Sequence, residues 1–160
     1  MAVAEATPVH AVQTLTSTGT FTNAQTVACG GKTYTTQTTL TDSDGNVLIG
    51  ADAEATHANL KAAINLEAGA GTTYATSMTL NKQVKATAVT ATTTTVKAKI
   101  PGTVGNNIPT TENQTNAAWG AAALAGGTGD AGAYIDSLIS LNQINSEVLQ
   151  DLKRLTLADD

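Results

Sequence analysis

The chain has 160 residues, a net charge of −5 and only eight Lys and Arg residues. The length fits one compact domain with an appendage, and the lack of a basic cluster argues against nucleic acid or an anionic membrane as the main partner. No stretch approaches the roughly 20 apolar residues of a membrane span, and the first residues lack the pattern of a secretory signal.

The chain opens with small residues and no clear period, so residues 1–13 are expected to form an N-terminal arm. From Leu15 apolar and polar residues alternate in "TLTSTGTFTNAQTVACGGKTYTTQTTLT", which predicts two or three β-strands. Gly30 and Gly31 can adopt the positive φ angles of a tight hairpin turn. The first strands are therefore expected to pair locally.

A turn and a helix follow. "DSDGN", residues 42–46, is rich in residues that favour turns. Asp52 is a plausible N-cap for a helix of about four turns, which Gly69 and Gly71 are expected to end. Strand character then resumes through residues 72–111, interrupted by turns at "NKQ" and "PGTVGNN".

The sequence predicts an α+β fold, in which a Thr-rich, mainly antiparallel β domain with one packed helix precedes a C-terminal amphipathic helix. The expected boundaries are an arm at 1–13, a β-rich domain at 14–128, a Gly-rich joint at 129–133 and the final helix at 134–158. The core is expected to include Phe21, Tyr34, Leu48, Ile49, Leu60, Ile64, Val89, Val96, Ile108 and Trp119.

Two motifs that suggest binding chemistry are incomplete. "GKT" at 31–33 ends like a phosphate-binding loop, but Thr26 stands where the first glycine is required. "DSDGN" begins like a calcium loop, but Val47 and Ala53 replace the required glycine and glutamate. A hairpin and a turn explain these segments better, so neither a metal nor a cofactor is expected.

No catalytic residues are predicted, because no acid, base and nucleophile fall into a recognisable pattern. His10 and His57 lack zinc-site spacing and are expected in the arm and on the exposed side of the helix. Cys29, the single cysteine, cannot form an internal disulfide and is expected to be a small buried apolar residue.

Four segments taken together resemble a small domain that recurs in tailed-bacteriophage fibre, tail, baseplate and head-attached proteins. They are "GGKTYT", "VLIGADAEATHANLKAAINLEAGAGTTY", "KAKIPGTVGNNIPTT" and "AAWGAAALAGGT", and they occur here in the same order as in that family. The resemblance spans residues 15–128 and implies a structural module without catalytic residues. Thr36 and Thr38 depart from it, since larger apolar residues are expected in that strand.

The last segment has a different character, because Leu, Ile and Val recur every three or four positions. Leu138, Asn145 and Leu152 fall at heptad position a, with Tyr134, Leu141, Val148 and Leu155 at position d. Ile135, Ile144 and Leu149 widen the apolar face, which favours three or more helices, or a helix lying against another protein. The alternative is a helix folded back onto its own domain through the Gly-rich joint.

The sequence predicts a non-enzymatic bacteriophage virion protein, made in the host cytoplasm and located in the virion. It is expected to be an oligomeric accessory or connecting component of the tail, collar, fibre or capsid surface, a trimer or higher, with other tail, portal-proximal or capsid proteins as partners. Capsid decoration and binding of host-surface glycans are the alternatives. Few aromatic residues are available for stacking on sugars, and a small hydrolase is the least favoured class.

Overall fold

The computed structural model describes residues 7–157, and its main feature is a pair of four-stranded sheets. The first sheet has the order β5 (Val84–Val89), β6 (Thr93–Ala98), β1 (Val12–Ser17) and β8 (Ala117–Trp119). The second has the order β4 (Asn46–Leu48), β3 (Lys32–Gln37), β2 (Thr26–Cys29) and β7 (Thr110–Glu112). Every strand pair is antiparallel except β3 with β4, which confirms the predicted fold class.

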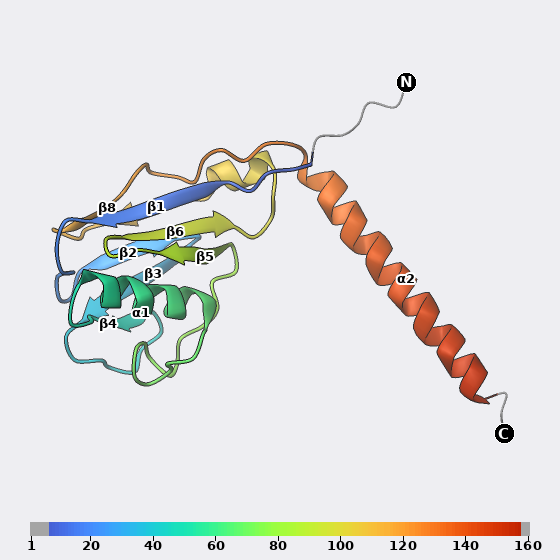
Figure 1. The fold of residues 1–160 in the computed structure, drawn as a ribbon, viewed down its shortest axis with the longest axis horizontal. Helices are drawn as coiled ribbons and strands as arrows, with labels where there is room; N and C mark the ends of the chain where they lie inside the picture. The colour runs from blue at the N-terminus through green and yellow to red at the C-terminus, as the bar shows by residue number, and fades with distance from the viewer. Residues whose placement is uncertain (1–6, 158–160) are drawn as a thin grey trace.

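Helix α1 (Ala53–Asn65) lies along one side of the two sheets (Figure 1), and a contact between two strands joins the sheets on the opposite side. The helix packs against β5 and β6 of one sheet and β4 of the other, while β7 lies against β8 on the opposite side. A short 3₁₀ helix, η1 (Thr103–Asn107), connects the sheets before β7. A second long helix, α2 (Ala131–Leu157), follows the domain and runs away from it.

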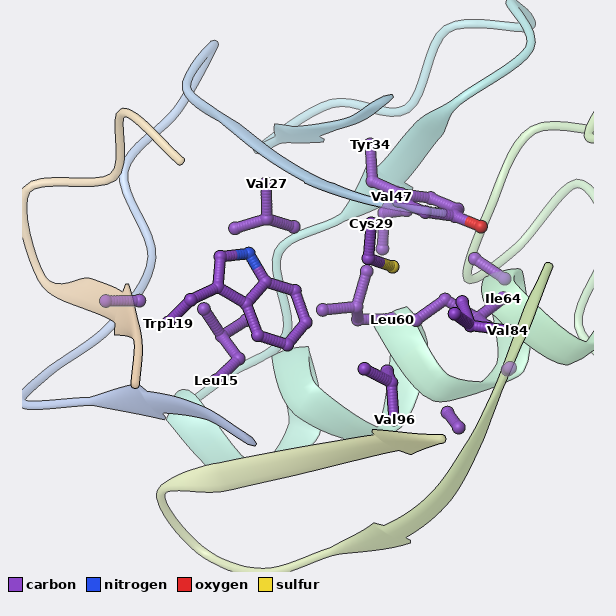
Figure 2. Close-up of a cluster of buried hydrophobic side chains, with 14 of the residues drawn as sticks. Leu15, Val27, Cys29, Tyr34, Val47, Leu60, Ile64, Val84, Val96 and Trp119 are labelled. Carbon is purple, nitrogen blue, oxygen red and sulfur yellow. The ribbon is translucent and has the colours of Figure 1, made fainter. Parts of the chain in front are cut away.

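The core lies between the sheets and beneath α1, as Figure 2 shows. Leu15 and Trp119 reach it from the first sheet, Tyr34 from the second and Leu60 from α1. Six of the ten predicted core residues are buried, namely Phe21, Tyr34, Leu60, Ile64, Val96 and Trp119. The other four are half-buried, namely Leu48, Ile49, Val89 and Ile108.

Local sequence signals formed as predicted in two places. Cys29 pairs with Lys32 across a two-residue turn in which Gly30 and Gly31 have φ of 58° and 72°, the geometry of a hairpin turn. The Asp52 side chain accepts a hydrogen bond of 2.8 Å from Ala55 N and caps α1. The end of α1 was predicted wrongly, because Leu66 adopts the left-handed conformation at φ 53° before Gly69 is reached.

The expected arm and joint are shorter than the sequence predicts. Ala11 is fully buried, and β1 already begins at Val12. Val9 forms an isolated bridge with Thr128, so the start of the domain is tied to the segment that precedes α2. Helix α2 begins at Ala131, three residues before the predicted start, and residues 1–6 lie outside the described residues.

Thr36 shows how this domain buries polar residues in its interior. Its side chain is fully buried, and its hydroxyl donates to Thr22 O at 2.7 Å and accepts from Gln114 Nε2 at 2.7 Å. The departure from the apolar pattern is thus compensated by hydrogen bonds, which remove most of the cost of burying a hydroxyl. Thr38 is exposed beyond the end of β3.

Three outer strand edges are covered by other parts of the chain. The Asn65 side chain bonds both the N and the O of Ala86 in β5 at 2.9 Å. The loop after α1 pairs with β4 through Leu48 N and Thr73 O at 2.9 Å, and Ala122 O accepts from Thr110 N of β7 at 2.9 Å. Covered edges do not offer free backbone groups to a strand of another protein.

Gly45 illustrates a backbone requirement that can be tested. Its φ is 95°, and a Cβ built on it would lie 2.5 Å from Thr33 O. Gly45→Ala is therefore expected to lower the free energy of unfolding by about 3 kcal/mol. Gly126→Ala is the matched control, with φ of 79° but no heavy atom within 4 Å of the added Cβ, and should cost about 1 kcal/mol. Urea unfolding measures both, and equal losses would contradict this account.

Candidate functional site

Helix α2 starts from a fixed point on the domain. Thr103 N donates to Gly129 O at 3.2 Å, and a Cβ added to Gly102 would lie 2.9 Å from that same oxygen. The Asp130 side chain accepts from Gly132 N at 2.8 Å, and Ala131 is buried. The root of α2, residues 129–131, is thus held against η1 rather than joined to the domain by a loose linker.

Beyond its root, α2 carries large apolar side chains that nothing covers. Leu138, Leu141 and Val148 are 48%, 55% and 53% exposed, and Ile135 and Ile144 are 44% and 55% exposed. A helix in which such side chains repeat at helical spacing buries them against another surface in a stable protein. The intramolecular alternative, a helix folded onto its own sheets, is not the arrangement seen here (Figure 1).

All of the predicted oligomerisation residues lie on α2. Tyr134 is half-buried, while Asn145 is exposed within the same stripe as Leu141 and Val148. Leu152 and Leu155 lie further along the same helix, and their side chains lie outside the described residues. Asp136, Ser140, Gln143 and Glu147 are exposed at the outer heptad positions f and c. The helix therefore has one wide apolar face and one polar face.

A buried cluster around His57 corrects one prediction, because this residue was expected to be exposed. His57 is fully buried, with Ser17 Oγ 2.9 Å from its Nε2 and Thr94 Oγ1 2.7 Å from its Nδ1. The Phe21 ring meets the imidazole edge to face, with centroids 5.0 Å apart. Burial lowers the pKa of His57 to about 4, so the imidazole is neutral at pH 7.

The serine and histidine of this cluster resemble a nucleophile and its base in their spacing. Ser17 is only 3% exposed, and His57 points from α1 onto the first sheet and is fully buried there, so a substrate has no path to the hydroxyl. Hydroxyl groups occupy both ring nitrogens and fix the imidazole in place. The cluster connects α1 to the first sheet. Sequence spacing could not reveal it, because its members come from β1, α1 and β6.

The acidic side chains of the "DSDGN" turn are also used structurally. Asp44 Oδ1 accepts from Lys32 Nζ and from Thr79 N at 2.9 Å, and Asp42 Oδ1 accepts from Ser77 N at 2.8 Å. The bond from Lys32 lowers the pKa of Asp44 to about 2. The carboxylates thereby attach the turn to residues 77–79. Over the described part of the chain, no three His, Cys, Asp or Glu side chains gather as a metal site would require.

Cys29 is buried as predicted, with 1% of its surface exposed. Burial raises the pKa of its thiol to about 12, so the reactive thiolate is scarce at pH 7. A surface cleft of about 430 Å³ is lined partly by Ile100, Val104, Ile108 and Pro109. None of the helices within residues 7–157 has the length and apolar character of a membrane span.

Comparison with protein-family models, with curated proteins and with solved structures finds no match to this chain. Two features of the structure bear on its function. They are the uncovered apolar face of α2 and the fixed root of that helix.

Proposed function

We propose that this chain is a non-enzymatic structural protein of a tailed-bacteriophage virion, an oligomeric accessory or connecting component of the tail, collar, fibre or capsid surface. In this proposal α2 is the assembly element and the β domain is the module that it positions. The observation that carries the proposal is the face of α2, where five Leu, Ile and Val side chains are 44–55% exposed.

Burial of this face supplies the driving force for assembly. Complete burial of one such side chain contributes about 1.5–3 kcal/mol, so covering a half-exposed one contributes about 1 kcal/mol. Five of these residues give about 5 kcal/mol per helix before the entropic cost of association. Symmetric repetition multiplies a contact of this size, which suits a component present in several copies.

The rest of the domain offers fewer means of association. The edges of β4, β5 and β7 are covered by the chain itself, so strand addition at these edges is blocked. The four segments that resemble the virion domain contribute the Gly30–Gly31 turn with β3, α1 with its flanks, η1 and β8. These are structural elements, in keeping with a module whose role is geometric.

Glycan binding is less well supported as an alternative. Phe21, Tyr34, Tyr74 and Trp119 are each at most 8% exposed, which leaves Tyr134 on α2 as the remaining aromatic residue. Sugar rings are commonly bound by stacking on exposed aromatic faces. Capsid decoration remains compatible with the same assembly element and differs only in the position of the protein in the particle.

Incorporation into virions tests the proposal. Leu141→Asp places a charge within the apolar face of α2, and burying an unpaired carboxylate is unfavourable. Particles produced with this variant are expected to contain less than about a tenth of the wild-type amount, equivalent to at least 1.4 kcal/mol in affinity. The measurement is a quantitative immunoblot of purified particles, with immunogold microscopy to find the protein's position.

Gln143→Asp is the matched control, because it adds the same charge at an exposed position on the polar face. This variant should be incorporated at the wild-type level. Two results would contradict the proposal: absence of the wild-type protein from purified particles, or incorporation of Leu141→Asp at the wild-type level.

A further inference from the structure

We infer that α2 associates with two further copies of itself in a parallel, in-register three-stranded coiled coil, in which three Asn145 side chains form one polar layer. This inference rests on the proposed role of α2 in assembly and adds the identity, number and direction of its partners. It follows from the pattern of the helix, its exposed face and its root.

Asn145 indicates that the partner is the same helix. It is exposed and lies between Leu141 and Val148 on the apolar face. Against an apolar groove of an unrelated protein, the buried amide would lose its hydrogen bonds to water. Against copies of itself in the same register, each amide meets another amide and both can donate and accept. An asparagine at one a position is known to fix register in this way.

The number of helices follows from the other core positions. A parallel dimer favours β-branched residues at position a and Leu at position d. This helix has Leu138 rather than a β-branched residue at a, and its d positions hold Val148 as well as Leu141. The apolar face also extends to Ile135 at position e and Ile144 at position g, which are 44% and 55% exposed. Three helices bury these flanking positions more fully than two. The face is therefore matched to a three-stranded bundle.

The polar face agrees with this arrangement. Asp136, Ser140, Gln143 and Glu147 occupy positions f and c, which remain in solvent around a coiled coil, and all four are exposed. Ile139 at position b is the exception, with 51% exposure outside the seam.

The direction follows from the root of α2. Val9 bonds with Thr128, and Gly102 N donates to Val9 O at 2.9 Å, so Val9, Ile100 and Val104 belong to segments that meet beside residues 129–131. These three side chains are 51%, 47% and 52% exposed. Parallel helices bring three such roots together, so that the apolar side chains gather near the axis, whereas antiparallel helices would separate them. The domain extends to one side of its helix (Figure 1).

Sedimentation equilibrium of the full chain tests the number of copies. The expected mass is three times the 16.1 kDa of one chain, and Gln143→Asp should keep it while Leu141→Asp reduces it to that of one chain. A wild-type protein that sediments as a monomer or dimer would overturn the inference.

Cysteine cross-linking tests direction and register. The native Cys29 is buried, so the wild-type chain is expected to remain uncross-linked. In the Leu138→Cys variant, parallel and in-register helices place the new thiols side by side, and mild oxidation should give a covalent dimer in most of the protein. Ser140→Cys, on the polar face two residues away, should react at least tenfold more slowly. Equal rates for the two variants, or no cross-linking of Leu138→Cys in a protein with the trimer mass, would overturn the parallel arrangement.

Asn145→Leu tests the polar layer. Removing the amides is expected to raise the unfolding temperature of the assembly and to broaden its mass distribution beyond the trimer, because register and number are no longer fixed. A variant that remains a uniform trimer, or that unfolds at a lower temperature, would contradict the role assigned to Asn145.

These experiments separate the two proposals. If the wild-type protein is found in virions but is a monomer in solution, the self-association inferred here fails and the virion role stands with a different partner. If it forms the parallel trimer but is missing from virions, the inference stands and the proposed function fails.

Discussion

Asn81→Ala is expected to lower the free energy of unfolding of the domain by about 4 kcal/mol. Asn81 is 1% exposed, and its side chain is bonded at both ends. Its Nδ2 donates to Cys29 O at 2.9 Å and to Tyr34 Oη at 3.2 Å, while its Oδ1 accepts from Gln83 N and Val84 N, both at 3.0 Å. One amide thus joins the β2 and β3 hairpin to the start of β5.

The size of the effect follows from the groups left without partners. Alanine would remove the side-chain partner of one carbonyl, of the Tyr34 hydroxyl and of two backbone N–H groups near the core. Each buried group left unsatisfied costs about 1–3 kcal/mol. The measurement is urea unfolding at one fixed protein concentration, followed by circular dichroism. Gln83→Ala is the control, because the Gln83 side chain is exposed, and should change stability by less than about 0.5 kcal/mol. A loss below 1 kcal/mol for Asn81→Ala would refute this role.

Acidification from pH 6.5 to pH 4 is expected to destabilise the domain by about 3 kcal/mol through His57 alone. Burial lowers the pKa of His57 in the folded state to about 4 from an ordinary value of 6.5. Between these values the unfolded chain binds a proton that the folded chain does not, so stability falls as pH falls. Each unit of difference in pKa corresponds to about 1.4 kcal/mol.

The pH window distinguishes His57 from the carboxylates. Lys32 holds the pKa of Asp44 at about 2, below its ordinary 3.8. The stability due to Asp44 is present above pH 3.8 and is lost as pH falls toward 2. Thermal unfolding measured at pH steps between 7.5 and 4.5 therefore reports mainly on histidine. His57→Gln should flatten this dependence. A wild-type stability that is flat over this range would rule out the buried neutral imidazole.

Local features of the fold could be predicted from the sequence because their causes are local. Gly30 and Gly31 determine their turn by their own φ angles, and Asp52 caps α1 through a residue three positions away. The prediction for the end of α1 failed because Gly69 was the obvious left-handed candidate, whereas Leu66 adopts that conformation earlier. The bond from Glu67 N to Ala62 O then ends the helix.

The polar interior could not be predicted, since its partners are distant in sequence. Thr36 meets Gln114 across 78 positions, and Asn81 meets Cys29 across 52. Without the fold, a threonine or an asparagine in a strand pattern is indistinguishable from a surface residue. The exposure of His57 was predicted wrongly for the same reason, because the hydroxyls that form hydrogen bonds with its ring nitrogens belong to β1 and β6.

Part of the candidate assembly surface could be predicted from the sequence. Helical period identified α2 and the stripe through Leu138, Leu141 and Val148. The period could not show whether that stripe lies on the domain or faces solvent, which depends on how the chain leaves the domain. The direction of the helix is determined by close packing at its root. A side chain added to Gly102 would collide with Gly129, and a side chain added to Gly129 would collide with Pro8.

The bridge between Val9 and Thr128 has a consequence for modularity. Because the chain enters the domain beside the point where it leaves, sequence on either side departs from the same end of the fold. A domain with adjacent entry and exit can be inserted into a longer polypeptide, duplicated or lost without displacing its neighbours. The loops at the opposite end, around Gly19 and Asn116, are then free to diversify independently of the segment that holds the domain in place.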